Sequence, residues 1–145
     1  MESAARIYAG PIVVTLVYLL LYYLFQLHIM RVKGRLVKEY KARGEKFDRY
    51  FGQDRHMLAA DRIQLNMLEH MPPFLILLWL AAVFVEPFFA TVVGGVYVAA
   101  RALYPFLMGA RLGRGIQARI LIATVTGYLA LVALMGGLVW RMVGA

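Results

Sequence analysis

Long apolar stretches alternate with short polar connections along this chain, and the alternation predicts its helices. Four apolar stretches, at about residues 10–30, 61–85, 88–108 and 117–140, carry few charges. An α-helix rises about 1.5 Å per residue, so about 20 residues cross the hydrocarbon core of a bilayer. The pattern therefore predicts four transmembrane helices, and the chain length suits a single domain over residues 1–145.

The polar connection at residues 31–60 separates the first two predicted helices. Its first part is expected to extend the first helix until Arg43-Gly44-Glu45 interrupts it. Its second part is expected to be an ordered loop around an aromatic core of Phe47, Tyr50 and Phe51, because acidic residues alternate there with basic ones. The other connections are short, so the helices are expected to run antiparallel in an all-α four-helix bundle.

The composition places this bundle in a membrane. Hydrophobic residues make up 62% of the chain, against about 45–50% in soluble domains. The chain has no cysteine, which excludes disulfides and thiolate metal sites. Its three histidines are scattered, which argues against a zinc site. We therefore expect an integral, multi-pass membrane protein without a bound metal.

The net charge of +8 is concentrated in one connection, since ten of the sixteen Lys and Arg residues fall between Arg31 and Arg62. A basic patch can bind nucleic acid, but next to apolar helices the positive-inside rule is the simpler explanation, so no nucleic-acid partner is expected. The rule places this connection and the basic residues 111–119 on the cytoplasmic side, with both termini outside. A compact chain without cysteine is compatible with a bacterial inner membrane.

Polar residues also recur inside two of the predicted helices. They stand at helical spacing: Arg62, Asn66 and Glu69 in the second helix, and Tyr97, Arg101, Tyr104 and Met108 in the third. Residues at this spacing share one helix face. Charged groups within a membrane usually pair, face a cavity or take part in chemistry. If the two faces meet, they form a pocket with two arginines and a single carboxylate.

This pocket has two interpretations. In the first, Glu69 pairs with Arg62 or Arg101 and locks the packing of the helices. In the second, the surplus of arginine binds an anionic ligand, because guanidinium groups match carboxylates with two hydrogen bonds. A thiol held beside an arginine would be largely thiolate at neutral pH. An adjacent apolar cleft between helices would then admit a lipid-soluble electrophile.

The run Arg62-x-x-x-Asn66-x-x-Glu69-x-x-Pro72, followed by Tyr97-x-x-x-Arg101-x-x-Tyr104, resembles the MAPEG family, the membrane-associated proteins of eicosanoid and glutathione metabolism. The resemblance covers nearly the whole chain and includes Gln64 and the pair Leu78-Trp79. It implies a homotrimer of four-helix subunits, with the cofactor glutathione bound between neighbouring subunits on the cytoplasmic side.

The resemblance also implies roles for individual residues. Arg62, Asn66 and Glu69 would hold the glutathione backbone, with Glu69 taking its ammonium group. Arg101 and Tyr104 would contact its carboxylates or peptide groups. The glutathione-binding residues that it implies are therefore Arg62, Gln64, Asn66, Glu69, His70, Arg101 and Tyr104, with Arg31 or Lys33 at the end of the first helix.

Three positions depart from the family pattern. His70 replaces a Tyr of other members, and we interpret it as a local hydrogen-bonding substitute rather than a base. Met108 stands where the family often has a second Tyr. The catalytic arginine that stabilises the thiolate is best matched by Arg119, early in the fourth helix, with Arg111 and Arg114 as alternatives because the preceding connection is longer here.

The leading hypothesis is a glutathione-dependent membrane enzyme, a transferase or peroxidase. It would conjugate glutathione to a lipophilic small molecule or reduce a lipid hydroperoxide, with Arg119 holding the thiolate. Two alternatives stay open. One is a non-enzymatic member that binds lipid or acts as a scaffold, which the missing second Tyr favours. The other is a small accessory subunit of a membrane complex, in which the polar faces form structural ion pairs.

Overall fold

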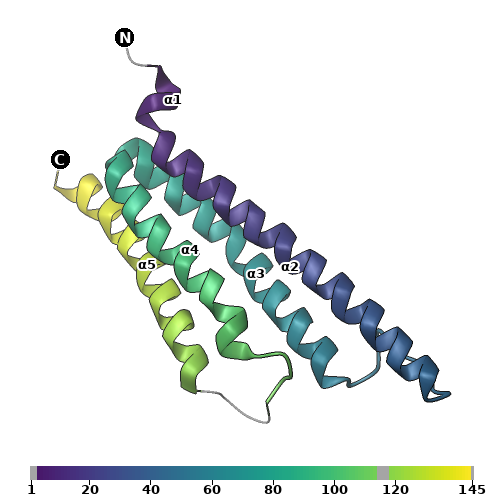
Figure 1. Ribbon diagram of the computed structural model, residues 1–145. Helices are drawn as coiled ribbons and strands as arrows, with labels where there is room; N and C mark the ends of the chain where they lie inside the picture. Colours follow the sequence, from purple (N-terminus) through teal and green to yellow (C-terminus); the bar gives the residue numbers. More distant parts are fainter. Residues whose placement is uncertain (1–2, 114–117, 145) are drawn as a thin grey trace.

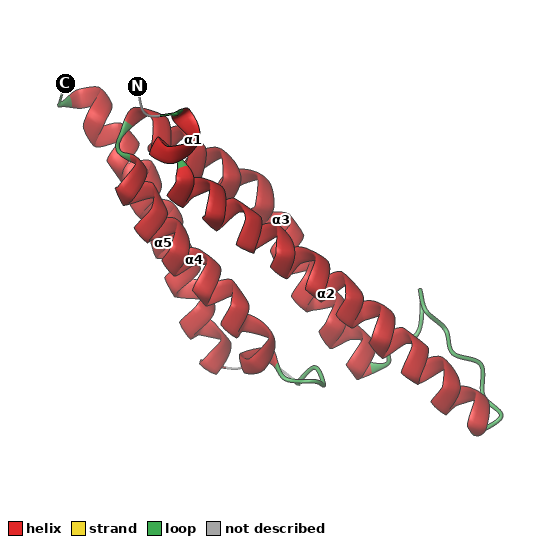
Figure 2. Cartoon of the chain, turned by 45° about the horizontal axis from the view of Figure 1, so that its top comes forward, coloured by secondary structure: helices red, strands yellow, loops and turns green. Residues whose placement is uncertain are grey.

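The computed structural model describes residues 3–113 and 118–144. Four long helices run antiparallel and side by side (Figure 1). They are α2 (Ala9–Ala42), α3 (Arg55–Phe84), α4 (Pro87–Met108) and α5 (Ala118–Val143), and a short α1 (Ala4–Ile7) precedes them. Each long helix is apolar and long enough to cross a membrane. The predicted all-α membrane fold is confirmed, since the described residues contain no strand (Figure 2).

Side-chain caps set where α3 and α4 begin. The Asp54 carboxylate accepts hydrogen bonds from two backbone N–H groups in the first turn of α3, at 2.9 and 3.2 Å. Glu86 does the same for α4, at 2.9 and 2.6 Å. Such caps satisfy amides that have no partner within the helix. The Asp54 cap starts α3 at Arg55, so the helix begins six residues before the membrane span predicted from about residue 61.

The connection between α2 and α3, at residues 43–54, follows the prediction only in part. The first helix does extend into the polar stretch, and α2 ends at Ala42 just before Gly44, whose φ is 73°. Phe47 packs edge-on against Tyr40, with ring centroids 5.4 Å apart. Tyr50 and Phe51, however, are 85% and 90% exposed, so the predicted aromatic core is wrong for these two residues.

An aromatic cluster holds three of the helices together. Phe74 of α3 stacks on Tyr97 of α4 with ring centroids 4.0 Å apart, and Tyr18 of α2 lies 5.0 Å from Phe74. The Tyr18 hydroxyl donates a hydrogen bond of 2.7 Å to the carbonyl of Met67. The cluster fixes α2, α3 and α4 relative to one another.

The arrangement of the helices creates two separate faces for a site. α2 and α5 each pack against both α3 and α4. The α3–α4 pair therefore lies between α2 and α5. A side chain of α3 or α4 that lies on one side of this pair does not reach the other side. One face points toward α2, and the other points toward α5.

Candidate functional site

The two polar faces predicted from the sequence meet where α3 packs on α4. Nη1 of Arg101 donates a short hydrogen bond to Oδ1 of Asn66. The Arg101 side chain is only 1% exposed. Arg62 lies one turn away, beside the hydroxyl of Tyr104. Residues predicted from spacing alone are thus in contact across the helix interface.

The fourth long helix completes this site. The His70 ring packs edge-on against the Tyr128 ring of α5, with centroids 5.2 Å apart and planes at 80°. Gly127 of α5 faces the guanidinium of Arg101, since a methyl group at this glycine would lie 2.7 Å from Nη2. Sequence reasoning missed Tyr128 as a site residue. One feature of the sequence could have identified it: Tyr128 is the only tyrosine in the apolar stretch of α5.

The guanidinium of Arg101 keeps unused hydrogen-bonding capacity. Its Nε and Nη2 atoms are buried, and neither has a hydrogen-bond partner in the described part of the chain. The Tyr97 ring lies beneath it, with the Arg101 Cζ atom 4.9 Å from the ring centroid. Burying a charge is costly unless hydrogen bonds satisfy it. The arrangement therefore favours an anionic group beside Arg101.

The structural ion pair considered from the sequence does not form. Among residues 3–113 and 118–144, Glu69 makes no salt bridge with Arg62 or Arg101. Its side chain is exposed. Pro72 and Pro73 lie inside α3 and have no N–H, so the carbonyl groups four residues earlier, of Leu68 and Glu69, lose their helical donors. Glu69 thus has a carboxylate without an ion-pair partner among the described residues, and its own backbone carbonyl lacks its helical donor.

Two predicted site residues lie elsewhere in the chain. Gln64 is buried, and its Oε1 atom has no hydrogen-bond partner among the described residues. It stands two residues from both Arg62 and Asn66, which is about 200° around the helix, so it lies on another face of α3. Arg31 is exposed, where the apolar part of α2 ends. Within one chain, neither residue joins Arg62, Asn66 and Arg101.

An apolar groove lies on the α2 side of the bundle. It has a volume of about 670 Å³ and runs between α2 and α4, with apolar residues such as Leu24 and Phe106 along its walls. His28 and Arg31 also line it. The structure thus contains the predicted kind of apolar cleft between helices. The cleft lies between α2 and α4, however, and not beside Arg62 and Arg101.

The arginines predicted near the start of the fourth helix differ in position. Nη2 of Arg119 lies 3.8 Å from the place where a Gly109 side chain would begin, and Gly109 lines the groove. Arg119 makes contacts within the protein. Arg111 is exposed, and Arg114 lies outside the described residues. Arg119 is therefore the described candidate close to the end of the groove.

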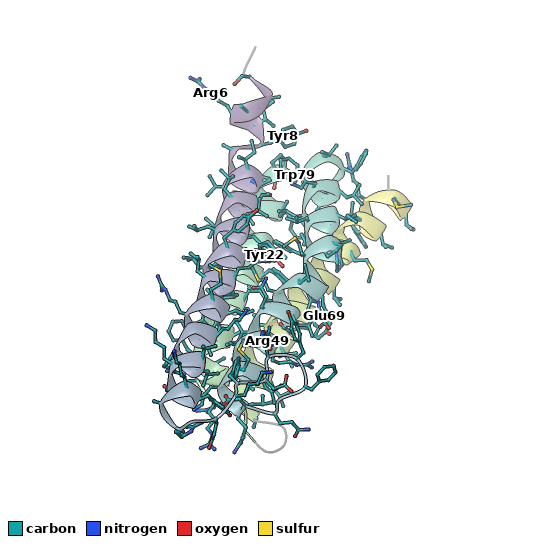
Figure 3. The ribbon with its side chains drawn as sticks, turned by 90° about the vertical axis from the view of Figure 1, so that its right-hand side faces the viewer. Arg6, Tyr8, Tyr22, Arg49, Glu69 and Trp79 are labelled. Atoms are coloured by element: carbon teal, nitrogen blue, oxygen red, sulfur yellow. The ribbon has the colours of Figure 1, made fainter. Side chains whose placement is uncertain are left out.

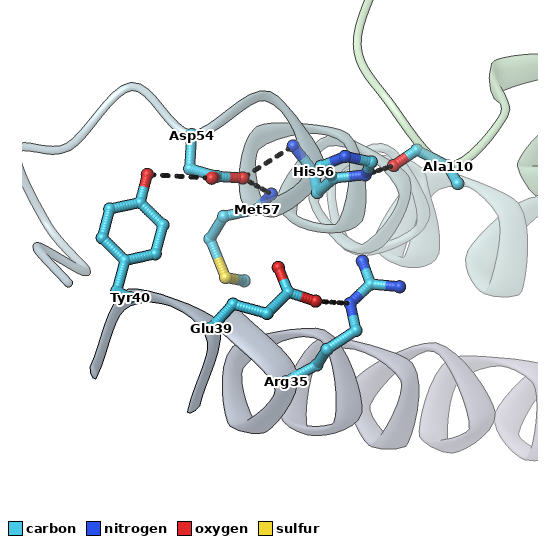
Figure 4. Close-up of polar contacts among 7 residues, drawn as sticks. All are labelled: Arg35, Glu39, Tyr40, Asp54, His56, Met57 and Ala110. Carbon is cyan, nitrogen blue, oxygen red and sulfur yellow. Dashed lines mark hydrogen bonds and ion pairs between the residues drawn. The ribbon is translucent and has the colours of Figure 1, made fainter. Parts of the chain in front are cut away.

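Hydrogen bonds tie the α4–α5 connection to the start of α3 (Figure 4). The His56 ring shares a hydrogen bond of 2.7 Å with the carbonyl of Ala110, and Leu112 N donates to the Arg55 carbonyl at 2.9 Å. Burial by itself would raise the pKa of Asp54, but the N–H groups it caps and the Tyr40 hydroxyl lower that pKa below its usual value. These contacts fix the start of α3 against the end of α2 and against the residues that follow α4.

Comparison with known sequences identifies the family. A profile of the MAPEG family matches residues 11–140, which include nearly all of the four long helices. The chain belongs to the MAPEG family. No curated protein sequence matches it. The MAPEG family includes glutathione transferases together with other members. Membership agrees with the membrane bundle and with the order of polar residues on α3 and α4 of this MAPEG protein.

Proposed function

We propose that this MAPEG protein is a glutathione-dependent membrane enzyme that conjugates glutathione to hydrophobic electrophiles or reduces lipid hydroperoxides. The main support is Arg101, a buried guanidinium that holds Asn66 and has two nitrogen atoms without a partner in the described chain. A carboxylate fits such a group, because guanidinium forms paired, charge-assisted hydrogen bonds with it. Glutathione carries two carboxylates, one ammonium group and one thiol.

The charges of the site complement those of glutathione. Arg62 and Arg101 would each take a carboxylate, and the exposed carboxylate of Glu69 would take the ammonium group. Asn66 and Tyr104 would bind the peptide groups. His70, packed against Tyr128, would help to close the site toward α5. The family resemblance likewise implies that Glu69 takes the ammonium group and that Arg101 and Tyr104 contact the carboxylates or peptide groups.

The chemistry would take place at the thiol. Arg119 would stabilise the thiolate by charge and hydrogen bonding, since a nearby cation lowers the pKa of a thiol. In a conjugation, the thiolate sulfur attacks the electrophilic carbon and forms a C–S bond, while the leaving group departs with its bonding electron pair. The groove that ends near Gly109 and Arg119 would bring the lipophilic substrate from the bilayer.

The assembly is proposed to be a homotrimer with glutathione between neighbouring subunits. Its support is that Gln64 and Arg31, which the family resemblance places at the site, lie away from Arg62 and Arg101 within one chain. A second copy of the chain would bring such residues to the site. The concentration of basic residues between Arg31 and Arg62 supports a cytoplasmic location for this end, as in a bacterial inner membrane.

Ligand binding by the purified protein tests this proposal. Calorimetry and thermal unfolding with millimolar glutathione should show heat of binding and a higher melting temperature. A ligand at about 100 times its dissociation constant stabilises a protein by about 2.7 kcal/mol. The matched control is the same tripeptide with alanine in place of the γ-glutamyl residue, which should bind more weakly. No heat and no thermal shift with glutathione would refute the proposal.

A non-enzymatic lipid-binding member is the second candidate. The volume and apolar lining of the α2–α4 groove favour it, as does Met108, which is buried among apolar residues. Turnover of chlorodinitrobenzene with glutathione separates the two functions. Turnover that Arg119→Ala abolishes supports the enzyme. Bound lipid without turnover supports the second candidate. A native mass spectrum in which the chain occurs mainly with other subunits supports instead the role of an accessory subunit of a membrane complex.

A further inference from the structure

Tyr50 and Phe51 form an exposed aromatic pair in the polar connection between α2 and α3. They are 85% and 90% exposed, although the other strongly exposed apolar residues lie mostly on the helices that cross the membrane. Burying an aromatic side chain is favourable because it removes a large apolar surface from water. A connection that holds two of them outward therefore loses stability unless they meet another surface.

The turn that carries this pair is built by specific hydrogen bonds. Oδ1 of Asp48 accepts from the backbone N–H groups of Tyr50 and Phe51, at 3.0 and 2.9 Å. These bonds lower the pKa of Asp48, so the carboxylate is charged at neutral pH. On the preceding side, Phe47 packs on Tyr40. The outward position of the pair is thus defined by the fold.

A bidentate salt bridge fixes the position of this turn along the bundle. Nη1 and Nη2 of Arg49 contact the two carboxylate oxygens of Asp61 at 2.9 and 2.8 Å (Arg49 is labelled in Figure 3). On the neighbouring residue Ala60, α3 packs in one apolar cluster with Val32 of α2. Asp61 therefore lies beside the part of α2 where the apolar stretch gives way to the basic residues that begin at Arg31, and we take this change as the edge of the bilayer.

The connection turns back from the end of α2 toward the apolar part of the bundle. α2 continues to Ala42, about 15 Å past Val32 at 1.5 Å per residue. Figure 2 shows the connection turning back from that end. The Arg49–Asp61 bridge ties the connection to the first part of α3, and Tyr50 and Phe51 follow Arg49 directly in the chain.

We propose that Tyr50 and Phe51 insert into the headgroup region of the adjacent leaflet and that anionic lipids strengthen this contact. Aromatic side chains favour the membrane–water interface. The segment from Arg31 to Arg62 has ten basic residues against five acidic ones, so it attracts anionic lipid. This membrane anchor would fix the depth of the basic end of the bundle, and it is independent of glutathione binding.

Spin labelling tests the anchor without altering the pair itself. The chain has no cysteine, so Gln53→Cys gives a single labelling site beside the intact pair, and Lys41→Cys in the last turn of α2 gives a reference in water. The full-length protein is placed in nanodiscs with and without anionic phospholipid. Collisions of the label with oxygen, which dissolves in bilayers, are compared with collisions with a water-soluble nickel chelate.

The anchor predicts a several-fold higher ratio of oxygen to nickel collisions at position 53 than at 41, and a higher ratio at 53 with anionic lipid. The ratio at 53 should fall toward that at 41 in Tyr50→Ser/Phe51→Ser and in Arg49→Gln. A label at 53 that is as open to nickel as the one at 41 overturns the proposal. So does a label shielded from both reagents, because that result indicates a protein contact.

Discussion

Gly127 of α5 leaves the space that the guanidinium of Arg101 occupies. A side-chain carbon at position 127 would lie 2.7 Å from Nη2 and 3.3 Å from Cζ of Arg101. The same guanidinium holds Asn66 through its other terminal nitrogen. Because Gly127 of α5 has no side chain, Arg101 of α4 lies where it can donate to the Asn66 amide of α3.

We expect Gly127→Ala to displace Arg101 and to weaken glutathione binding. The added methyl group overpacks a buried site, which typically costs about 1–3 kcal/mol. A displaced guanidinium would also loosen its hydrogen bond to Asn66. Calorimetry with glutathione should show an affinity lowered by about tenfold or more, since 1.4 kcal/mol is a factor of ten.

Two neighbouring glycines of α5 provide matched controls. A methyl group at Gly136 meets nothing within 4 Å, so Gly136→Ala should leave binding unchanged and keep or raise stability. A methyl group at Gly137 would lie 2.9 Å from the Phe89 ring, so Gly137→Ala should lower stability while affinity for glutathione is retained. If Gly127→Ala behaves like Gly136→Ala, the positioning of Arg101 by Gly127 is wrong.

Helical spacing predicted the α3 and α4 parts of this site, because residues three and four apart share a face whatever surrounds them. The family resemblance grouped Gln64 with Arg62, although two residues two positions apart lie about 200° from each other around a helix. The early start of α3 was readable in principle from Asp54, a residue type that caps helices.

The contributions of α5 were not predictable in the same way. Gly127 and Tyr128 reach the site only because α5 packs against both α3 and α4, which is a property of the folded bundle. Likewise, the Arg49–Asp61 bridge, which joins the connection to α3, helps to place Tyr50 and Phe51. Local patterns carry no information about such contacts.

Replacing Arg101 should separate stability from binding. Its charge is buried and, among the described residues, has one side-chain hydrogen bond, from Nη1. Arg101→Met should therefore keep or raise the melting temperature, as hydrophobic replacements of buried charges often do. Glutathione affinity should fall by about 10–100-fold, because a hydrogen bond to a charged group is worth about 1.5–3 kcal/mol. A lower melting temperature with unchanged affinity would assign Arg101 a purely structural role.

Acid should weaken the start of α3 through Asp54. Its pKa is lowered in the folded protein, so its contribution is fully present above the unfolded pKa of about 3.9 and is lost as pH falls through the lower folded value. At pH 7, Asp54→Ala should cost about 1 kcal/mol for the lost cap. Thermal unfolding should show this difference shrinking below about pH 4.

The control for this effect is Asp54→Asn. Asparagine keeps an oxygen that can cap the helix but does not titrate. Its stability should therefore lie close to the natural protein at low pH, with no titration of its own in this range. A gap between Asp54→Ala and the natural protein that stays constant down to pH 3 would contradict the role of the Asp54 charge.

Arg119 should control the ionisation of bound glutathione. A free thiol has a pKa of about 8.5, and a nearby cation lowers it. We expect Arg119→Ala to move the pKa of the bound thiol back toward 8.5 and to lower turnover by about 10²–10³, the usual effect of removing one stabilising donor. The ultraviolet absorption of the thiolate, followed against pH, measures this directly. Arg111→Ala removes an exposed charge from the same connection and should change neither quantity. If Arg111→Ala raises the thiol pKa and Arg119→Ala does not, the thiolate is held from the connection rather than from the first turn of α5.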